Sequence, residues 1–178
     1  MKRRIALLLV LIPVAGLFSY TATGKEVARM TTIAFSSPAF HGGEAIPAKY
    51  TCDGADASPP LAIGPVPMGT ASLALIMDDP DAPVGTWVHW VMWNIPPQTR
   101  EIHENSVPAG ASQGRNDWHR IGYGGPCPPS GAHRYFFKLY ALDIPLHLSA
   151  ATIKADLERA MQGHILGKGE LMGTYRKR

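Results

Sequence analysis

The sequence contains only two cysteines in 178 residues, and only 17% of its residues are charged. Two thiols are too few for a disulfide-rich scaffold or for a four-thiolate metal site. The low charge is combined with 46% hydrophobic residues, which excludes an intrinsically disordered chain. Turn-forming residues are plentiful, with 18 glycines and 16 prolines, and they favour many turns and short strands over a helical bundle.

An excess of positive charge is also lacking outside the N-terminus. Lys2, Arg3 and Arg4 account for the formal net charge of +3, and the remaining basic and acidic residues balance. The basic character of the chain is therefore no sign of nucleic-acid binding, and no nucleic-acid partner is expected. We interpret the terminal run at 176–178 as a solvated tail.

Residues 1–24 have the pattern of a secretory signal peptide. The basic start is followed by 14 uncharged residues, 5–18, and small residues at 22–24 allow cleavage before Lys25. Residues 25–30 then form a linker and 31–178 a single domain, and the protein is expected in the periplasm or secreted. An uncleaved membrane anchor is the alternative, as is a start at Met30 without the leader. In an oxidising compartment Cys52 and Cys127 could pair.

The body of the chain is predicted to be mainly β. A central strand, apolar on both faces, is expected at Trp87–Ile95, and alternation places His89 on one face with Trp87, Val91 and Trp93. One helix is expected near the C-terminus from Ile153, Leu157, Ala160, Met161 and His164, with Ser149 as its cap. The other strand candidates are Thr32–Phe35, Ser72–Met77, Arg134–Ala141 and Glu170–Tyr175.

Three patches carry candidate chemistry. Asp78-Asp79-Pro80-Asp81-Ala82-Pro83 follows a hydrophobic strand and brings together carboxylates that repel one another. His89 lies within an apolar strand, where a histidine is more often a satisfied core residue than a ligand-binding one. A glycine- and proline-rich loop at 124–132 leads into His133 and Tyr135. Imidazoles and loop N–H groups can donate to phosphate oxygens, while carboxylates orient the imidazoles.

These three motifs, in this order, resemble the phosphatidylethanolamine-binding protein family, which includes the Raf kinase inhibitor proteins. The bacterial branch is the closer match, on Tyr50-Thr51-Cys52-Asp53-Gly54, Ser58-Pro59-Pro60-Leu61 and the Gly-Pro-Cys-Pro-Pro run. The resemblance covers residues 31–175. It implies a β-sandwich-like fold with a C-terminal helix and other short peripheral helices around a small anion pocket.

The resemblance also implies a ligand site. That site comprises Asp79, Asp81, His89, Pro128, His133 and Tyr135. A cis peptide at Ala82–Pro83 is implied as well. The expected ligand is a small phosphate-bearing group or a phospholipid headgroup, with no cofactor and no catalysis. A homodimer is left open by analogy with bacterial relatives.

Other functions remain as alternatives. One is a protein inhibitor of a protease or a kinase that acts through the pocket rim. An enzyme using Cys127 and His133 as nucleophile and base is disfavoured by the stiff prolines around Cys127 and by its possible pairing with Cys52. A metal site from Asp79, Asp81, His89 and His133 is weaker than the anion pocket, and no metal is expected.

Overall fold

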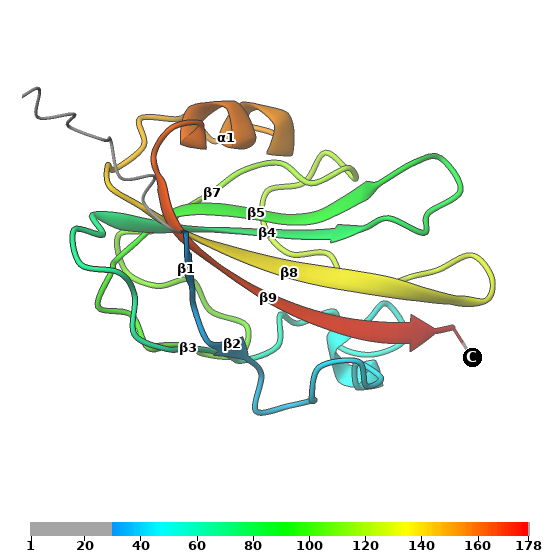
Figure 1. The fold of residues 1–178 in the computed structure, drawn as a ribbon. Coiled ribbons are helices and arrows are strands. Elements are labelled where there is room, and N and C mark those ends of the chain that lie inside the picture. The colour runs from blue at the N-terminus through cyan, green and yellow to red at the C-terminus, as the bar shows by residue number, and fades with distance from the viewer. Residues whose placement is uncertain (1–29, 178) are drawn as a thin grey trace, which may run out of the picture.

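The computed structural model describes residues 30–177, and the expected leader at 1–24 lies outside them, as does most of the linker at 25–30. Two sheets are stacked in this part of the chain (Figure 1). The larger has the order β1-β9-β8-β4-β5-β7 and the smaller the order β2-β3-β6. The elements, in chain order, are β1 (Thr31–Thr32), β2 (Phe35–Ser36), the 3-10 helix η1 (Ala48–Tyr50), β3 (Leu61–Ile63), β4 (Ser72–Asp79), β5 (Trp87–Ile95), β6 (Glu101–Ile102), β7 (Ser112–Gln113), β8 (Ala132–Leu142), α1 (Lys154–Met161) and β9 (Ile165–Arg176).

The mainly β prediction with one C-terminal helix is confirmed. The strand at 87–95 has the predicted bounds, and the strands predicted at 72–77, 134–141 and 170–175 lie within β4, β8 and the longer β9. The weak candidate at 32–35 is instead divided between β1 and β2, which belong to different sheets. Burial still alternates along the segment, since Ile33 and Phe35 are buried and Thr32 and Ala34 are exposed.

Helix α1 is shorter than its periodicity suggested. It begins after Ile153, whose backbone N–H donates to Asp156 Oδ2 at 3.3 Å, so Ser149 is not its cap. Ser149 instead closes the preceding turn by accepting from the backbone of Thr152. None of the helices among residues 30–177 is long and apolar enough to cross a membrane.

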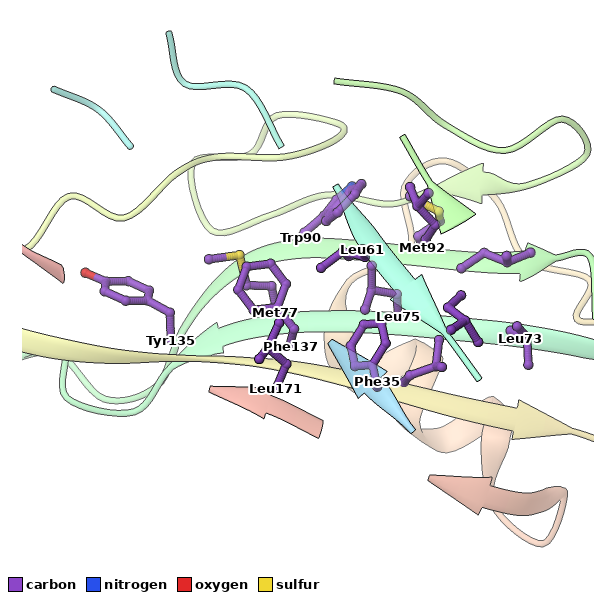
Figure 2. Packing of buried hydrophobic residues seen from close by; sticks show 14 of the residues in the cluster. Phe35, Leu61, Leu73, Leu75, Met77, Trp90, Met92, Tyr135, Phe137 and Leu171 are labelled. Carbon is purple, nitrogen blue, oxygen red and sulfur yellow. The ribbon is translucent and has the colours of Figure 1, made fainter. Parts of the chain in front are cut away.

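The main hydrophobic core fills the space between the two sheets. Phe35 and Leu61 of the smaller sheet lie opposite Leu75 and Phe137 of the larger one (Figure 2). A second core lies on the other face of the larger sheet, beneath α1, and contains Val91, Trp93, Leu157 and Met161 among its members. Strand β5 therefore contributes to both cores, as expected for a strand that is apolar on both faces.

The strict alternation predicted for β5 is broken at His89. The register pairs Met77 with Trp90 and Asp78 with Val88, which leaves His89 as an extra residue without a partner on β4. Such a β-bulge re-aims the side chains that follow it. Val91 and Trp93 consequently belong to the core under α1, whereas His89 contacts Tyr135 on the other face, so the prediction that they share a face is wrong.

Candidate functional site

A cavity of about 220 Å³ lies at the end of the larger sheet where β4 ends and β5 and β8 begin. Figure 1 shows the β4–β5 turn and the loop before β8 at this end of the sheet. Three polar side chains, Asp79, His89 and His133, contribute to its wall. The rest is mainly apolar and comprises Ala82, Pro83, Val84, Trp87, Trp118, Cys127, Pro128 and Pro129.

His89 reaches this cavity because the bulge turns it away from the α1 face. Its ring is held edge-on between Trp118 and Tyr135, with centroid distances of 5.0 and 5.1 Å. Nδ1 lies 2.6 Å from the carbonyl oxygen of Gly124, so this nitrogen carries the hydrogen and donates. Burial lowers the pKa of His89, and the Gly124 hydrogen bond only partly opposes this effect. The folded protein therefore favours a neutral His89.

His133 is oriented by a carboxylate. Its Nδ1 donates to Asp79 Oδ2 at 2.8 Å, and both side chains are almost fully buried. The other oxygen of Asp79 accepts the backbone N–H of Asp81 at 2.8 Å. Asp79 thus fixes both the imidazole and the start of the β4–β5 turn, and leaves Nε2 of His133 without a partner within residues 30–177.

Asp81 is held by Arg134 instead of contributing to the cavity wall. Its carboxylate accepts from Arg134 Nε at 2.9 Å, Nη2 at 2.7 Å and the Arg134 backbone N–H at 2.9 Å. These hydrogen bonds lower the pKa of Asp81 to about 2. The pair ties the β4–β5 turn to the first residues of β8, next to His133.

Two buried hydrogen-bond donors near the cavity make no hydrogen bond of good geometry to the described residues. They are the hydroxyl of Tyr135 and the indole Nε1 of Trp87. Burial, followed by the nearby Asp79 carboxylate, raises the pKa of Tyr135 above its usual range, so the hydroxyl keeps its proton. Buried polar groups without a close protein partner are uncommon, so these two donors mark the polar part of this region.

A disulfide joins the cavity wall to the segment after η1. Cys52 and Cys127 are bonded, with their Cα atoms 5.4 Å apart, and Cys127 is one of the lining residues. The backbone N–H of Cys52 also donates to the carbonyl of Pro126 at 3.1 Å. The residue that the enzyme alternative needs as a nucleophile is therefore covalently occupied.

The same segment holds the start of the glycine-rich loop. The N–H of Gly125 donates to Asp56 Oδ1 at 2.6 Å, and the Tyr123 hydroxyl donates to the Tyr50 carbonyl at 2.6 Å. A Cβ on Gly125 would lie 2.5 Å from that carbonyl oxygen, so only glycine fits here. This fixes the preceding residue, Gly124, whose carbonyl accepts from His89.

Of the six residues in the predicted site, the structure places Asp79, His89, Pro128 and His133 on the cavity wall. Tyr135 lies against His89, and Asp81 pairs with Arg134. Among residues 30–177 no group of three His, Cys, Asp or Glu side chains could hold a metal ion.

The cis peptide implied at Ala82–Pro83 is absent, because all peptide bonds among the described residues are trans. The turn is closed instead by Gly85, whose N–H donates to the Ala82 carbonyl at 3.1 Å. Its φ of +100° is a conformation that suits glycine.

Sequence reasoning missed some contributors to this site. Trp87, predicted on the apolar face of the central strand, is half-buried on the cavity wall. Its position two residues before His89 was the sequence feature that could have indicated this role. The roles of Arg134 and of the Gly124 carbonyl depend on contacts between distant segments, which a single sequence does not reveal. Trp118, which follows β7 in the chain, also lines the cavity.

The fold and the cavity define a two-sheet β protein with a small polar site at one end of its larger sheet. The family model described as phosphatidylethanolamine-binding protein matches residues 36–176, and the chain belongs to this family.

Relatives with high identity support the assignment. A UPF0098 protein of Methanothermobacter thermautotrophicus is 52% identical over 144 residues, which cover 78% of this chain and 95% of the relative. The crystal structure of CT736, a phosphatidylethanolamine-binding protein homologue from Chlamydia trachomatis, has 42% identity and a TM-score of 0.80, covering 83% of this chain and 99% of that one. Escherichia coli YbcL, described as a member of the mammalian family, has 30% identity and a TM-score of 0.78, covering 83% and 100%.

Proposed function

We propose that this protein binds a small phosphate-bearing group in the cavity beside His89 and His133, without catalysing a reaction on it. The main support is that two imidazoles from different strands meet at one cavity, and that Nδ1 of each donates to a fixed acceptor. Their Nε2 atoms and the indole N–H of Trp87 are the polar groups that can contact ligand oxygens. The Tyr135 hydroxyl lies next to Asp79, and the Tyr135 ring packs against His89.

The size of the cavity suits a headgroup and not a whole lipid. Its volume of about 220 Å³ is below the roughly 300 Å³ at which pockets for drug-sized ligands begin. The rim is apolar, and Val84 on it is 77% exposed. A ligand such as phosphoethanolamine would place its phosphate inside, and any attached group would contact this rim.

Binding without catalysis is supported by the state of Cys127. Its sulfur is bonded to Cys52, so it cannot attack a ligand as a thiolate. Pro128 and Pro129 stiffen the wall that follows it.

We also propose that the protein functions outside the cytoplasm. The signal-like pattern of residues 1–24 and the Cys52–Cys127 disulfide support an oxidising compartment. N-terminal sequencing of the protein from its own cells tests this. A chain that begins near Lys25 is expected, and a soluble cytosolic chain that begins at Met1 would contradict the proposal.

Titration with phosphoethanolamine, followed by NMR, tests the ligand site. Resonances of Asp79, His89, His133 and Tyr135 should shift. Loss of one charge-assisted hydrogen bond costs about 1.5–3 kcal/mol, so His89→Ala should weaken binding by roughly ten- to a hundredfold. His147→Ala is the matched control, because His147 is exposed and outside the cavity. Shifts confined to another region, or equal binding by His89→Ala, would refute the assignment.

A further inference from the structure

The cavity is unusual for an anion site because its wall contains no permanent cation. Within residues 30–177, its lining residues carry one formal charge, the carboxylate of Asp79, and include no lysine or arginine. Arg134, which follows His133 in the sequence, is committed to Asp81 through two side-chain hydrogen bonds. The Asp79 carboxylate accepts hydrogen bonds but has no permanent cation beside it on the cavity wall, so it would repel an anion placed there. Positive charge must therefore be supplied when the anion binds.

Of the lining residues, His89 and His133 are the ones that can gain a positive charge. In both, Nδ1 already donates, to Gly124 at 2.6 Å and to Asp79 at 2.8 Å. A neutral imidazole with its hydrogen on Nδ1 has only an acceptor at Nε2. An anion oxygen is also an acceptor, so neither Nε2 can bind it until a proton is added between them.

We propose, on the basis of the function proposed above, that the cavity takes up an anion together with one proton, which Nε2 of His133 holds. A charged His133 would lie between two negative groups, the Asp79 carboxylate on Nδ1 and the anion on Nε2. His89 has a neutral carbonyl on Nδ1 and aromatic rings on both sides. Burial lowers the pKa of His89, which is consistent with its staying neutral.

The other ionisable groups around the two imidazoles do not remove this requirement. Beside His133, Asp81 is paired with Arg134, and Tyr175 on β9 donates its hydroxyl to Asp53 at 2.7 Å. On the side of His89, the groups that act on it electrostatically are all carboxylates, namely Asp78, Asp79 and Asp117. Lys138 and Lys154 neutralise Asp78, and the hydroxyl of Tyr135 stays protonated.

Calorimetric titration with inorganic sulfate tests the proposal, because sulfate does not change its own charge near neutral pH. Repeating the titration in buffers of different ionisation enthalpy counts the protons taken up. We expect about one proton taken up per sulfate near pH 8, and an affinity that falls about tenfold for each pH unit over which that proton must come from solution. Inorganic phosphate serves only as a second probe for binding itself, because its own P–OH hydrogen can bridge to an Nε2 without proton uptake.

Two matched variants identify the proton carrier. His133→Gln offers an amide N–H at every pH, so its sulfate affinity should change less than about twofold over the range in which the parent changes tenfold. His89→Gln should keep the pH slope of the parent, because His89 stays neutral when the anion binds. Thermal unfolding checks that each variant is folded, and His133→Asn replaces His133→Gln if the latter is not.

Each outcome decides a separate point. If neither sulfate nor phosphate binds the parent protein at mildly acidic pH, the function proposed above is wrong, and this inference with it. If sulfate binds without proton uptake, that function stands and the inference is overturned. If His133→Gln keeps the parental slope, or His89→Gln loses it, His133 is not the proton carrier. The proton count on the parent protein needs no variant and is decisive even if both variants fail to fold.

Discussion

Asp78 and Asp79 are adjacent in the sequence, yet their carboxylates lie on opposite faces of the larger sheet. Asp78 accepts from Lys138 at 2.8 Å and from Lys154 of α1 at 2.5 Å, on the helix side. Asp79 accepts from His133 on the cavity side. Successive side chains of a strand point to opposite faces, so the two carboxylates have different roles. Asp78 binds lysines on the helix side, and Asp79 orients His133 at the cavity.

The two aspartates should therefore respond differently to the same substitution. Asp78→Asn removes the charge that two lysines share, and breaking a buried ion pair costs about 3–5 kcal/mol. We expect a loss near 3 kcal/mol in unfolding free energy, because both lysines can reach water, with phosphoethanolamine binding little changed. Asp79→Asn should weaken binding by at least about tenfold and cost less stability. Denaturant unfolding and NMR titration of both variants check this, and the reverse ranking would contradict it.

Trp93 tests the second core. It is 1% exposed and packs with Val91 and Leu157 beneath α1, away from the cavity. Trp93→Ala should lower the unfolding free energy by about 3–5 kcal/mol, the usual cost of removing a buried tryptophan side chain. Urea denaturation measures the change. A loss below about 1 kcal/mol would show that this face of β5 does not carry a core.

The fold was largely predictable because its strands have strong local signals. β4 and β5 are largely apolar runs, and β8 alternates between buried and more exposed residues; all three patterns can be recognised in the sequence. The extra residue at His89 was not predictable, since a bulge depends on the register between two strands.

The candidate site was predictable in its residue types but not in all its connections. Asp79, His89 and His133 stand out because charged and imidazole side chains interrupt apolar or glycine-rich segments. That Asp81 pairs with Arg134 instead of lining the cavity follows from the β8 backbone beside the turn. A single sequence does not indicate that Asp81 and Arg134, which are 53 positions apart, are in contact.

The Cys52–Cys127 disulfide should support both stability and the cavity. It closes a segment with a sequence separation of 75, for which chain entropy gives a stabilisation of about 4 kcal/mol. Cys52→Ser with Cys127→Ser should lose stability of that order. Phosphoethanolamine binding should also weaken, because Cys127 forms part of the wall. Unfolding and binding are measured on the double variant and on the parent with and without reductant. Unchanged binding by the folded double variant would show that two hydrogen bonds hold the loop without the disulfide: the one that Gly125 N–H donates to Asp56, and the one that the backbone N–H of residue 52 donates to Pro126.

Acid should destabilise the protein in two separate pH ranges. Burial lowers the pKa of His89, so below its ordinary value of about 6.5 the unfolded chain binds a proton that the folded protein does not. Stability therefore rises with pH through this range and is lost on acidification. The Arg134 hydrogen bonds lower the pKa of Asp81 from 3.8 to about 2, so its contribution is present above pH 3.8 and disappears as the pH falls toward 2.

Unfolding free energies of the parent, His89→Gln and Asp81→Asn, measured across this pH range, separate the two contributions. His89→Gln should flatten the curve below about pH 6.5 and leave the Asp81 range unchanged. Asp81→Asn should do the opposite, with a smaller amplitude because the Asp81 and Arg134 side chains are 29% and 53% exposed and water screens their attraction. A His89→Gln curve parallel to that of the parent from neutral pH to mildly acidic pH would show that His89 takes up a proton as readily in the folded protein as in the unfolded chain.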